Sequence, residues 1–180
     1  MPSARPTPGD TRWFVRDRLG LFIHWGIYSL AARHEWIKQC EEIPDNVYDR
    51  YLDYFEPDRY DPDEWASMAS DAGMKYLVVT TKHHDGFCLW DSKLTDYKVT
   101  NTPCGRDLIG PMVEAFRARD IRVGFYYSLL DWRFPGYFEP GKHRDSAEAM
   151  VQQFHAQVRE LMTNYGKIDV LWYDLSLIHI

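Results

Sequence analysis

Two adjacent histidines and an aspartate, His83, His84 and Asp85, follow the apolar stretch KYLVVTTK, which runs from Lys75 to Lys82. A stretch of this kind is typical of a buried strand, so three ionisable side chains at its end call for a physical reason. Metal binding, recognition of a hydroxylated ligand and structural hydrogen bonding are three roles that these residue types can fill.

Polar side chains also follow three other apolar stretches of the chain. Each stretch predicts one strand of a parallel sheet, and in βα proteins the carboxyl ends of such strands share the face that carries the site. The connections expected at the opposite end, near residues 71–75 and 119–122, are short and offer no such groups. We therefore expect one site at the strand ends, with these further candidates: His24, Tyr126, Tyr127, Asp131, Trp132, Trp172 and Asp174.

A metal centre is disfavoured by the spacing of the histidines. A hydrolytic zinc site generally needs three histidine or carboxylate ligands and one open position. Successive side chains of a regular strand point to opposite faces, so His83 and His84 could reach one ion only through a bulge or a turn. The sequence also lacks the HxH spacing that would place two imidazoles on the same face. We therefore expect no bound metal.

The remaining groups suit a sugar. No GxSxG motif is present, and Cys88 and Cys104 lack a neighbouring group that would activate a thiol. Imidazoles, indoles, phenols and carboxylates suit a polyhydroxylated ligand, because hydroxyls need donors and acceptors and aromatic rings cover sugar C–H faces. Cleavage of a sugar needs two carboxyl groups, and Asp174 is the best candidate for the attacking one. Its partner is not evident in the sequence.

The elements that must position these groups alternate between strand and helix. Strands are predicted at 21–26, 75–82, 122–128 and 168–174, and helices at 61–73, 108–120 and 146–166. Asp61 is the predicted N-cap of the first of these helices, and Pro111 indicates that the second begins near that residue. Apolar strands separated by amphipathic helices predict an α/β fold with a parallel sheet, either doubly wound or closed as an eight-stranded βα barrel. The absence of a phosphate-binding glycine pattern after the first strand favours the barrel.

Composition restricts the classes of partner. The 180 residues are 45% hydrophobic and carry a formal net charge of -6 with both signs interspersed, so a nucleic-acid partner is not expected. The odd number of cysteines, at no metal-ligand spacing, indicates reduced thiols. The first residues contain no apolar segment typical of a signal peptide, and no apolar run is long enough to cross a membrane. These features predict a cytoplasmic protein.

Four blocks of the sequence resemble consecutive signature blocks of the α-L-fucosidases, glycoside hydrolase family twenty-nine. They are RLGLFIHWGIYSLAARHEW, KYLVVTTKHHDGFCLWDS, VGFYYSLLDW and GKIDVLWYD, in the family's order. The resemblance implies the N-terminal half of a TIM-type (β/α)8 barrel, truncated after strand four, from a family whose barrel is usually followed by a β-sandwich. It also implies retaining hydrolysis of an α-L-fucoside, in a glycan or a smaller glycoside, without a metal or organic cofactor.

The family's residue roles carry over where its motifs match this sequence. Asp174 matches the catalytic nucleophile. Several residues match groups that bind the sugar within the pocket: His24, Glu35, Trp36, His83 and His84. Two aromatic residues, Tyr127 and Trp172, match the walls of the pocket, although the adjacent Tyr126 competes with Tyr127 for the inward position.

Several of these residues also have a purely structural interpretation. His24 could be a core histidine with satisfied hydrogen bonds, and Asp85 could cap the turn that follows it. Asp131 is expected to hold the loop after the third strand, and Trp132 to serve in packing. A catalytic role is preferred for Asp174, because a carboxylate at the carboxyl end of a barrel strand is usually catalytic.

Four strands make half of a barrel, and a complete barrel takes about 250 residues. The family's proton-donating carboxylate is therefore expected beyond the fourth strand. Residues 1–174 are interpreted as a partial barrel domain. Residues 175–180, LSLIHI, match the translation of a transposon end used in preparing sequencing libraries and are interpreted as a non-native tail. With one strand edge unpaired, this polypeptide alone is expected to be unstable and without turnover.

Two other functional classes remain open from the sequence. A metal-dependent barrel hydrolase would lose its activity when the metal is chelated. A non-catalytic fucose-binding protein would bind the sugar without releasing it from a glycoside.

Overall fold

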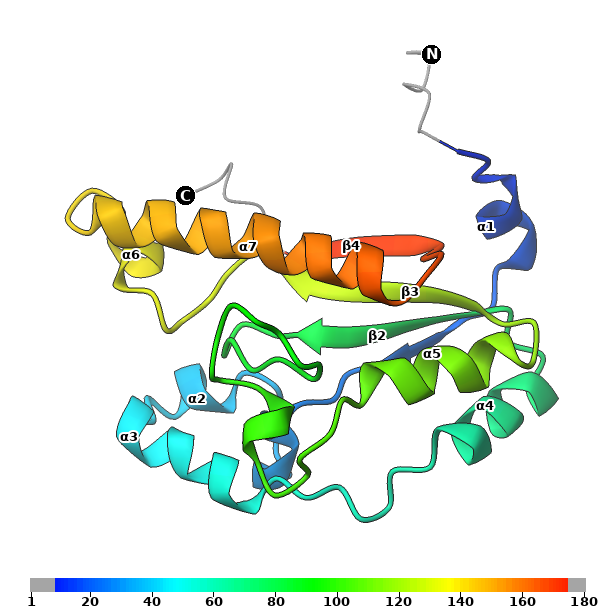
Figure 1. Ribbon diagram of the computed structural model, residues 1–180, viewed down its shortest axis with the longest axis horizontal. Helices are drawn as coiled ribbons and strands as arrows, with labels where there is room; N and C mark the ends of the chain where they lie inside the picture. Colours follow the sequence, from blue (N-terminus) through cyan, green and yellow to red (C-terminus); the bar gives the residue numbers. More distant parts are fainter. Residues whose placement is uncertain (1–8, 175–180) are drawn as a thin grey trace.

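The computed structural model describes residues 9–174, which contain a parallel sheet of four strands (Figure 1). The strands are β1 (Leu21–Ile23), β2 (Tyr76–Lys82), β3 (Arg122–Ser128) and β4 (Val170–Asp174). They are hydrogen-bonded in the order β1-β2-β3-β4. Sequential order and parallel direction are the features expected of half of a βα barrel. The interpretation of residues 175–180 as a non-native tail lies outside the described residues.

Helices lie alongside the sheet and beyond the carboxyl ends of its strands (Figure 1). Helix α4 (Pro62–Asp71) precedes β2, α5 (Ile109–Arg117) precedes β3 and α7 (Arg144–Asn164) precedes β4. Short helices occupy the segment before β1 and the connections that follow β1, β2 and β3. They are α1 (Arg12–Asp17), η1 (Ile27–Ala31), α2 (Ile37–Cys40), α3 (Asp45–Tyr48), η2 (Asp49–Tyr54), η3 (Val99–Asn101) and α6 (Pro135–Phe138), of which η1, η2 and η3 are 3-10 helices.

The starts of α4 and α5 both follow from the sequence. Asp61 caps α4 by accepting a hydrogen bond from the backbone N–H of Glu64 at 2.9 Å, as predicted. Helix α5 begins at Ile109, near Pro111 as predicted, and Pro111 lies in its first turn, where a proline is tolerated. The side chain of Asp107 accepts the backbone N–H of Ile109 at 2.7 Å.

The two faces of the sheet have different surroundings. The concave face carries large aromatic side chains that meet across the sheet: the ring of Phe22 in β1 lies 5.1 Å from that of Trp172 in β4 and 5.8 Å from that of Tyr126 in β3. Contact between side chains of the two edge strands shows that the sheet is curved as in a barrel. The outer face packs in a continuous hydrophobic core that includes Leu77, Val79, Val123, Phe125 and Tyr127.

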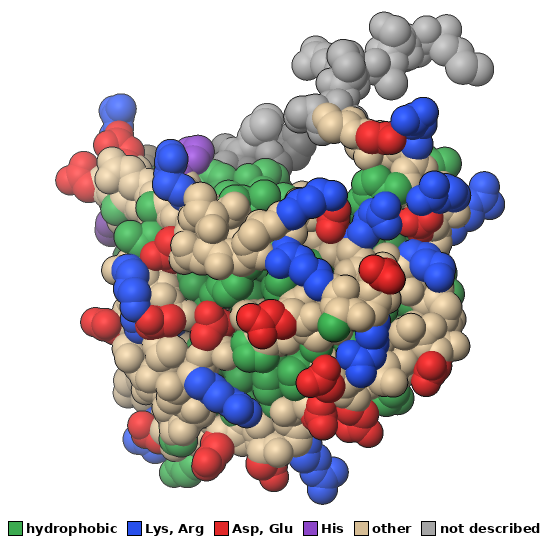
Figure 2. Space-filling model, turned by 45° about the vertical axis from the view of Figure 1, so that its right-hand side comes forward, with side chains coloured by type: hydrophobic (Ala, Val, Ile, Leu, Met, Phe, Trp, Pro, Cys, Tyr) green, Lys and Arg blue, Asp and Glu red, His purple; other side chains and the backbone are tan. Residues whose placement is uncertain are grey.

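The described surface carries charges of both signs. Figure 2 shows basic and acidic side chains side by side on one face of the molecule, with apolar side chains between them. Such a mixture creates little long-range field of one sign. Within residues 9–174, no helix is both long and apolar enough to span a membrane.

Candidate active site

The end of β2 turns His83 toward the concave face. β2 pairs with β3 in regular register as far as Thr80, opposite Tyr126, and one extra residue then intervenes before Lys82 pairs with Tyr127. A bulge of this kind reverses the alternation of the side chains that follow it. Lys82 therefore points to the outer face, with its ammonium 4.7 Å from the Tyr127 ring centroid, while His83 stacks on Tyr126 with ring centroids 5.5 Å apart.

His84 reaches the same side through the tight turn that follows β2. The backbone N–H of Gly86 donates to the carbonyl of His83 at 3.1 Å, and the N–H of Trp132 donates to the carbonyl of His84 at 2.8 Å. The two imidazole centroids lie 4.1 Å apart. The two imidazoles share a face because the strand ends at Lys82 and does not continue regularly through them, which is the exception that the sequence left open.

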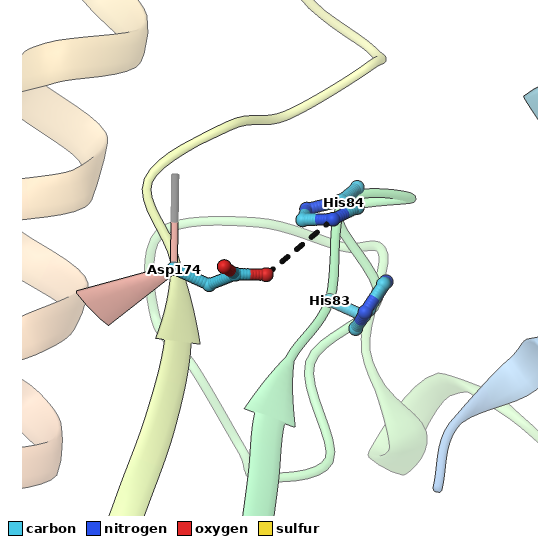
Figure 3. Close-up of side chains that lie close together, drawn as sticks. All are labelled: His83, His84 and Asp174. Carbon is cyan, nitrogen blue, oxygen red and sulfur yellow. Dashed lines mark ion pairs between the residues drawn. The ribbon is translucent and has the colours of Figure 1, made fainter. Parts of the chain in front are cut away.

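Asp174 ends β4, and its carboxylate points toward the imidazole of His84 (Figure 3). The register pairs Ser128 with Asp174 and Tyr126 with Trp172. The hydroxyl of Tyr126 donates to Oδ2 of Asp174 at 2.5 Å, and the same oxygen lies 3.6 Å from Nε2 of His84. Three strands thus bring a carboxylate, a phenol and two imidazoles together, as their positions at the strand ends predict.

Of the two adjacent tyrosines, Tyr126 is the inward one. Tyr127 is buried on the outer face, where its hydroxyl donates to Oε1 of Gln157 in α7 at 2.6 Å. Tyr127 therefore does not line the concave face, which corrects the expectation from the sequence. The sequence leaves this choice open because it depends on the register of β3 against its neighbours.

The connection after β1 supplies another side of the site. The indole of Trp36 lies 4.8 Å from the imidazole of His84, measured between ring centroids. The imidazole of His24 lies 5.7 Å from that of His83, and the ring of Tyr28 lies 5.3 Å from it. Tyr28 was not singled out in the sequence, because no motif marks a tyrosine in an irregular connection.

Burial keeps the clustered imidazoles neutral. It lowers the pKa of His83 to about 2 and the pKa of His84 to about 4, and it also lowers the pKa of His24. The carboxylates of Glu35 and Asp174 act in the opposite direction and raise the pKa of His24 and of His84. The carboxylate of Glu35 therefore lies close enough to influence the same histidines, as its predicted position in the connection after β1 requires.

Neutral imidazoles can bind either hydroxyls or a metal ion. Nδ1 of His83 is buried and has no hydrogen-bond partner within residues 9–174. A buried nitrogen of this kind is costly to leave unpaired, so it points to a ligand that supplies the missing hydrogen bond. One ligand atom from each of His83, His84 and Asp174 also lies within 4.8 Å of the others, which is close enough to hold a metal ion.

Asp85 and Asp131 support the histidine turn instead of joining the site. Asp85 accepts hydrogen bonds from the hydroxyl of Tyr48 at 2.9 Å and from the backbone N–H of Phe87 at 3.0 Å. Burial raises the pKa of Asp85 to about 6. The carboxylate of Asp131 lies 3.6 Å from the buried ammonium of Lys82. The geometry supports the structural interpretation of both aspartates.

Comparisons with known proteins identify the relatives of this chain. The family model described as "Alpha-L-fucosidase" matches residues 4–179. Tissue alpha-L-fucosidase of Bos taurus is 33% identical over 95% of this chain and 40% of its own length. The structure of alpha-L-fucosidase isoenzyme 1 from Paenibacillus thiaminolyticus is 54% identical, with a TM-score of 0.84, and the match covers 92% of this chain and 42% of that one.

A second solved structure bears on the chemistry of the relatives. It is a GH29 alpha-L-fucosidase from Bacteroides thetaiotaomicron, trapped as a covalent intermediate with 2-fluoro-fucosyl fluoride. It is 34% identical with a TM-score of 0.88, and the match covers 96% of this chain and 43% of that one. This chain therefore spans about two fifths of the length of these three relatives.

The turn that carries His83 and His84 depends on a glycine. Gly86 has a φ of +85°, and a Cβ atom on it would lie 2.7 Å from Oδ1 of Asp131. In the whole protein, Gly86→Ala should therefore lower the free energy of unfolding by about 1–3 kcal/mol more than Gly73→Ala, measured by urea denaturation. Gly73 is the matched control, because it has a φ of +77° with no atom within 4 Å of the added Cβ. Equal losses of unfolding free energy in the two variants would show that the Asp131 carboxylate does not restrict the side chain at position 86.

The pKa of His84, lowered to about 4, predicts that this imidazole stays neutral from about pH 8 to about pH 5. Since the unfolded pKa is about 6.5, the contribution of His84 to stability is complete above that pH and is lost as the pH falls toward 4. NMR titration of the whole protein labelled with 15N-histidine measures this directly, and the spectrum of His84→Gln assigns the resonance. A midpoint near 6.5 for His84 would contradict the prediction.

Proposed function

The chain belongs to the alpha-L-fucosidase family, and from this premise we propose that the whole protein is a retaining α-L-fucosidase acting on fucosylated glycans or glycosides. The observation that carries the proposal is the convergence of Asp174, Tyr126, His83 and His84 at the carboxyl ends of three strands. The covalent intermediate trapped in the Bacteroides relative supports a double displacement, because retaining enzymes pass through such a species.

Asp174 is the proposed nucleophile. Tyr126 and His84 both face its Oδ2, which leaves Oδ1 available to attack the anomeric carbon. Attack forms an ester between Asp174 and fucose while the bond to the leaving oxygen breaks, and a second carboxyl group donates a proton to that oxygen. Water, deprotonated by the same second group, then cleaves the ester and restores the carboxylate.

The imidazoles and aromatic rings bind the sugar in this proposal. His24, His83 and His84 hydrogen-bond the hydroxyls, and Nδ1 of His83 accepts from one of them in place of its missing partner. Glu35 and Trp36 reach the hydroxyls from the connection after β1. A separate apolar surface, formed by the rings of Trp172 and Phe22, is suited to the methyl face of a deoxy sugar.

The second carboxyl group is proposed to lie in a part of the whole protein that this chain does not contain, because the chain spans about two fifths of the length of its relatives. By themselves, these 180 residues are expected to have no turnover. Trp172 is 45% exposed on the concave face, so the proposed sugar site is open to water without further strands.

The key test replaces the proposed nucleophile in the whole protein. Asp174→Gly should lower kcat for release of nitrophenol from an aryl α-L-fucoside by at least about 1,000-fold, because no covalent intermediate can form. Added azide should restore part of the rate by attacking the anomeric carbon in the space left by the side chain. Asp120→Gly, an exposed aspartate before β3 with a φ of +56°, is the matched control and should retain full activity.

Two outcomes of that experiment would count against the proposal. Unchanged turnover in Asp174→Gly would remove this residue from the role of nucleophile. Fucose binding without turnover in the unaltered whole protein would favour a non-catalytic fucose-binding protein.

A metal-dependent hydrolase is the second candidate, because His83, His84 and Asp174 can place three ligand atoms within 4.8 Å of one another. The two candidates differ in their response to chelation. We expect full aryl α-L-fucosidase activity after dialysis against EDTA, since the imidazoles are proposed to bind hydroxyls. Loss of activity with EDTA and recovery with zinc would favour the metal-dependent hydrolase.

A further inference from the structure

Ser128, the last residue of β3, has a fully buried hydroxyl that faces three polar groups. Its Oγ lies 2.6 Å from Nδ1 of His84, and it lies 3.1 Å from both the backbone N–H and the carbonyl oxygen of Leu130. The N–H of Leu130 donates to Oγ. A hydroxyl carries a single hydrogen, so it can be given either to the Leu130 carbonyl or to His84.

The surroundings decide where this hydrogen goes. The carbonyl of Leu130 already accepts a hydrogen bond from the ammonium of Lys82 at 2.9 Å, which leaves one of its two lone pairs for Ser128. Lys82 is itself buried, so its ammonium cannot turn to solvent. The contact to Nδ1 of His84 is also the shorter of the two choices, by the distances of 2.6 Å and 3.1 Å. The shorter contact favours Nδ1 of His84 as the acceptor of the Ser128 hydrogen.

A neutral imidazole has one N–H, so an accepting Nδ1 leaves the hydrogen on Nε2. We propose that Ser128 is a positioning residue that fixes His84 as the Nε2–H tautomer and so presents a donor, not a lone pair, toward Asp174. The inference rests on the proposed function for its catalytic meaning, while the tautomer itself rests on the hydrogen bonds alone.

The distance between His84 and Asp174 suits a sugar hydroxyl that accepts from the N–H at Nε2. Nε2 lies 3.6 Å from Oδ2 of Asp174, which is longer than a good hydrogen bond. A sugar hydroxyl bound beside both groups can accept from Nε2–H and donate to the carboxylate. In the opposite tautomer, Nε2 would present a lone pair toward the carboxylate. A hydroxyl bound between these two acceptors has one hydrogen, so it could bond only one of them.

The tautomer of His84 can be determined by NMR in the absence of substrate. In the whole protein labelled with 15N-histidine, two-bond 1H–15N correlations distinguish a protonated Nε2 from a protonated Nδ1, and His84→Gln assigns the signals. We expect His84 to carry its hydrogen on Nε2 in the unaltered protein and to populate the other tautomer in Ser128→Ala. A hydrogen on Nδ1 in the unaltered protein would overturn the inference, even if Ser128→Ala did not fold.

Ser92→Ala is the matched control. Ser92 is equally buried and its Oγ accepts the backbone N–H of Leu94 at 3.2 Å, but within residues 9–174 it forms no hydrogen bond with an imidazole. We expect Ser92→Ala to keep the tautomer of His84 and the activity. Ser128→Ala should lower kcat by about 10- to 100-fold, the effect of one lost hydrogen bond to a side chain that orients the substrate, and Ser128→Thr should restore part of it.

The two measurements separate failure of this inference from failure of the proposed function. An Nε2–H tautomer that Ser128→Ala alters, in a whole protein without fucosidase activity, would support the role of Ser128 and contradict the proposed function. Full activity together with an unaltered tautomer in Ser128→Ala would contradict the role of Ser128 and leave the proposed function standing.

Discussion

The parallel register of β3 against β4 is the constraint on which the site depends. It pairs Tyr126 with Trp172 and Ser128 with Asp174, and side chains two residues apart in a strand share a face. A shift of β4 by one residue would turn Asp174 toward the helix-covered face and away from the imidazoles. Backbone hydrogen bonds between two strands therefore decide where the carboxylate lies, and the phenol that donates to it comes from the same pairing.

The bulge in β2 supplies the other half of the arrangement. One extra residue sends Lys82 outward and His83 inward. Once outward, the ammonium of Lys82 donates to the carbonyl of Leu130, and the hydroxyl of Ser128 contacts both that carbonyl and Nδ1 of His84. The bulge in β2 thus directs His83 inward. It also places the ammonium of Lys82 beside the groups that contact Nδ1 of His84. Burial of the same group of residues keeps these imidazoles neutral, which suits them to hydroxyls.

Local patterns were enough to predict the strands, the cap at Asp61 and the meeting of polar side chains at one end of the sheet. The direction of His83 could not be predicted, because counting residues along a strand does not reveal an inserted one. The choice between Tyr126 and Tyr127 needed the register of strands that lie far apart in the sequence. Ser128 gave no signal, since its importance comes from a histidine 44 positions earlier in the chain.

The central claim is that Asp174 provides the oxygen that attacks the sugar. The most direct measurement is to incubate the whole protein with 2-fluoro-fucosyl fluoride, the reagent that trapped the covalent intermediate of the Bacteroides relative, and to map the modified peptide by mass spectrometry. We predict one fluoro-fucosyl group, attached to Asp174. Attachment to a different carboxylate would contradict the account.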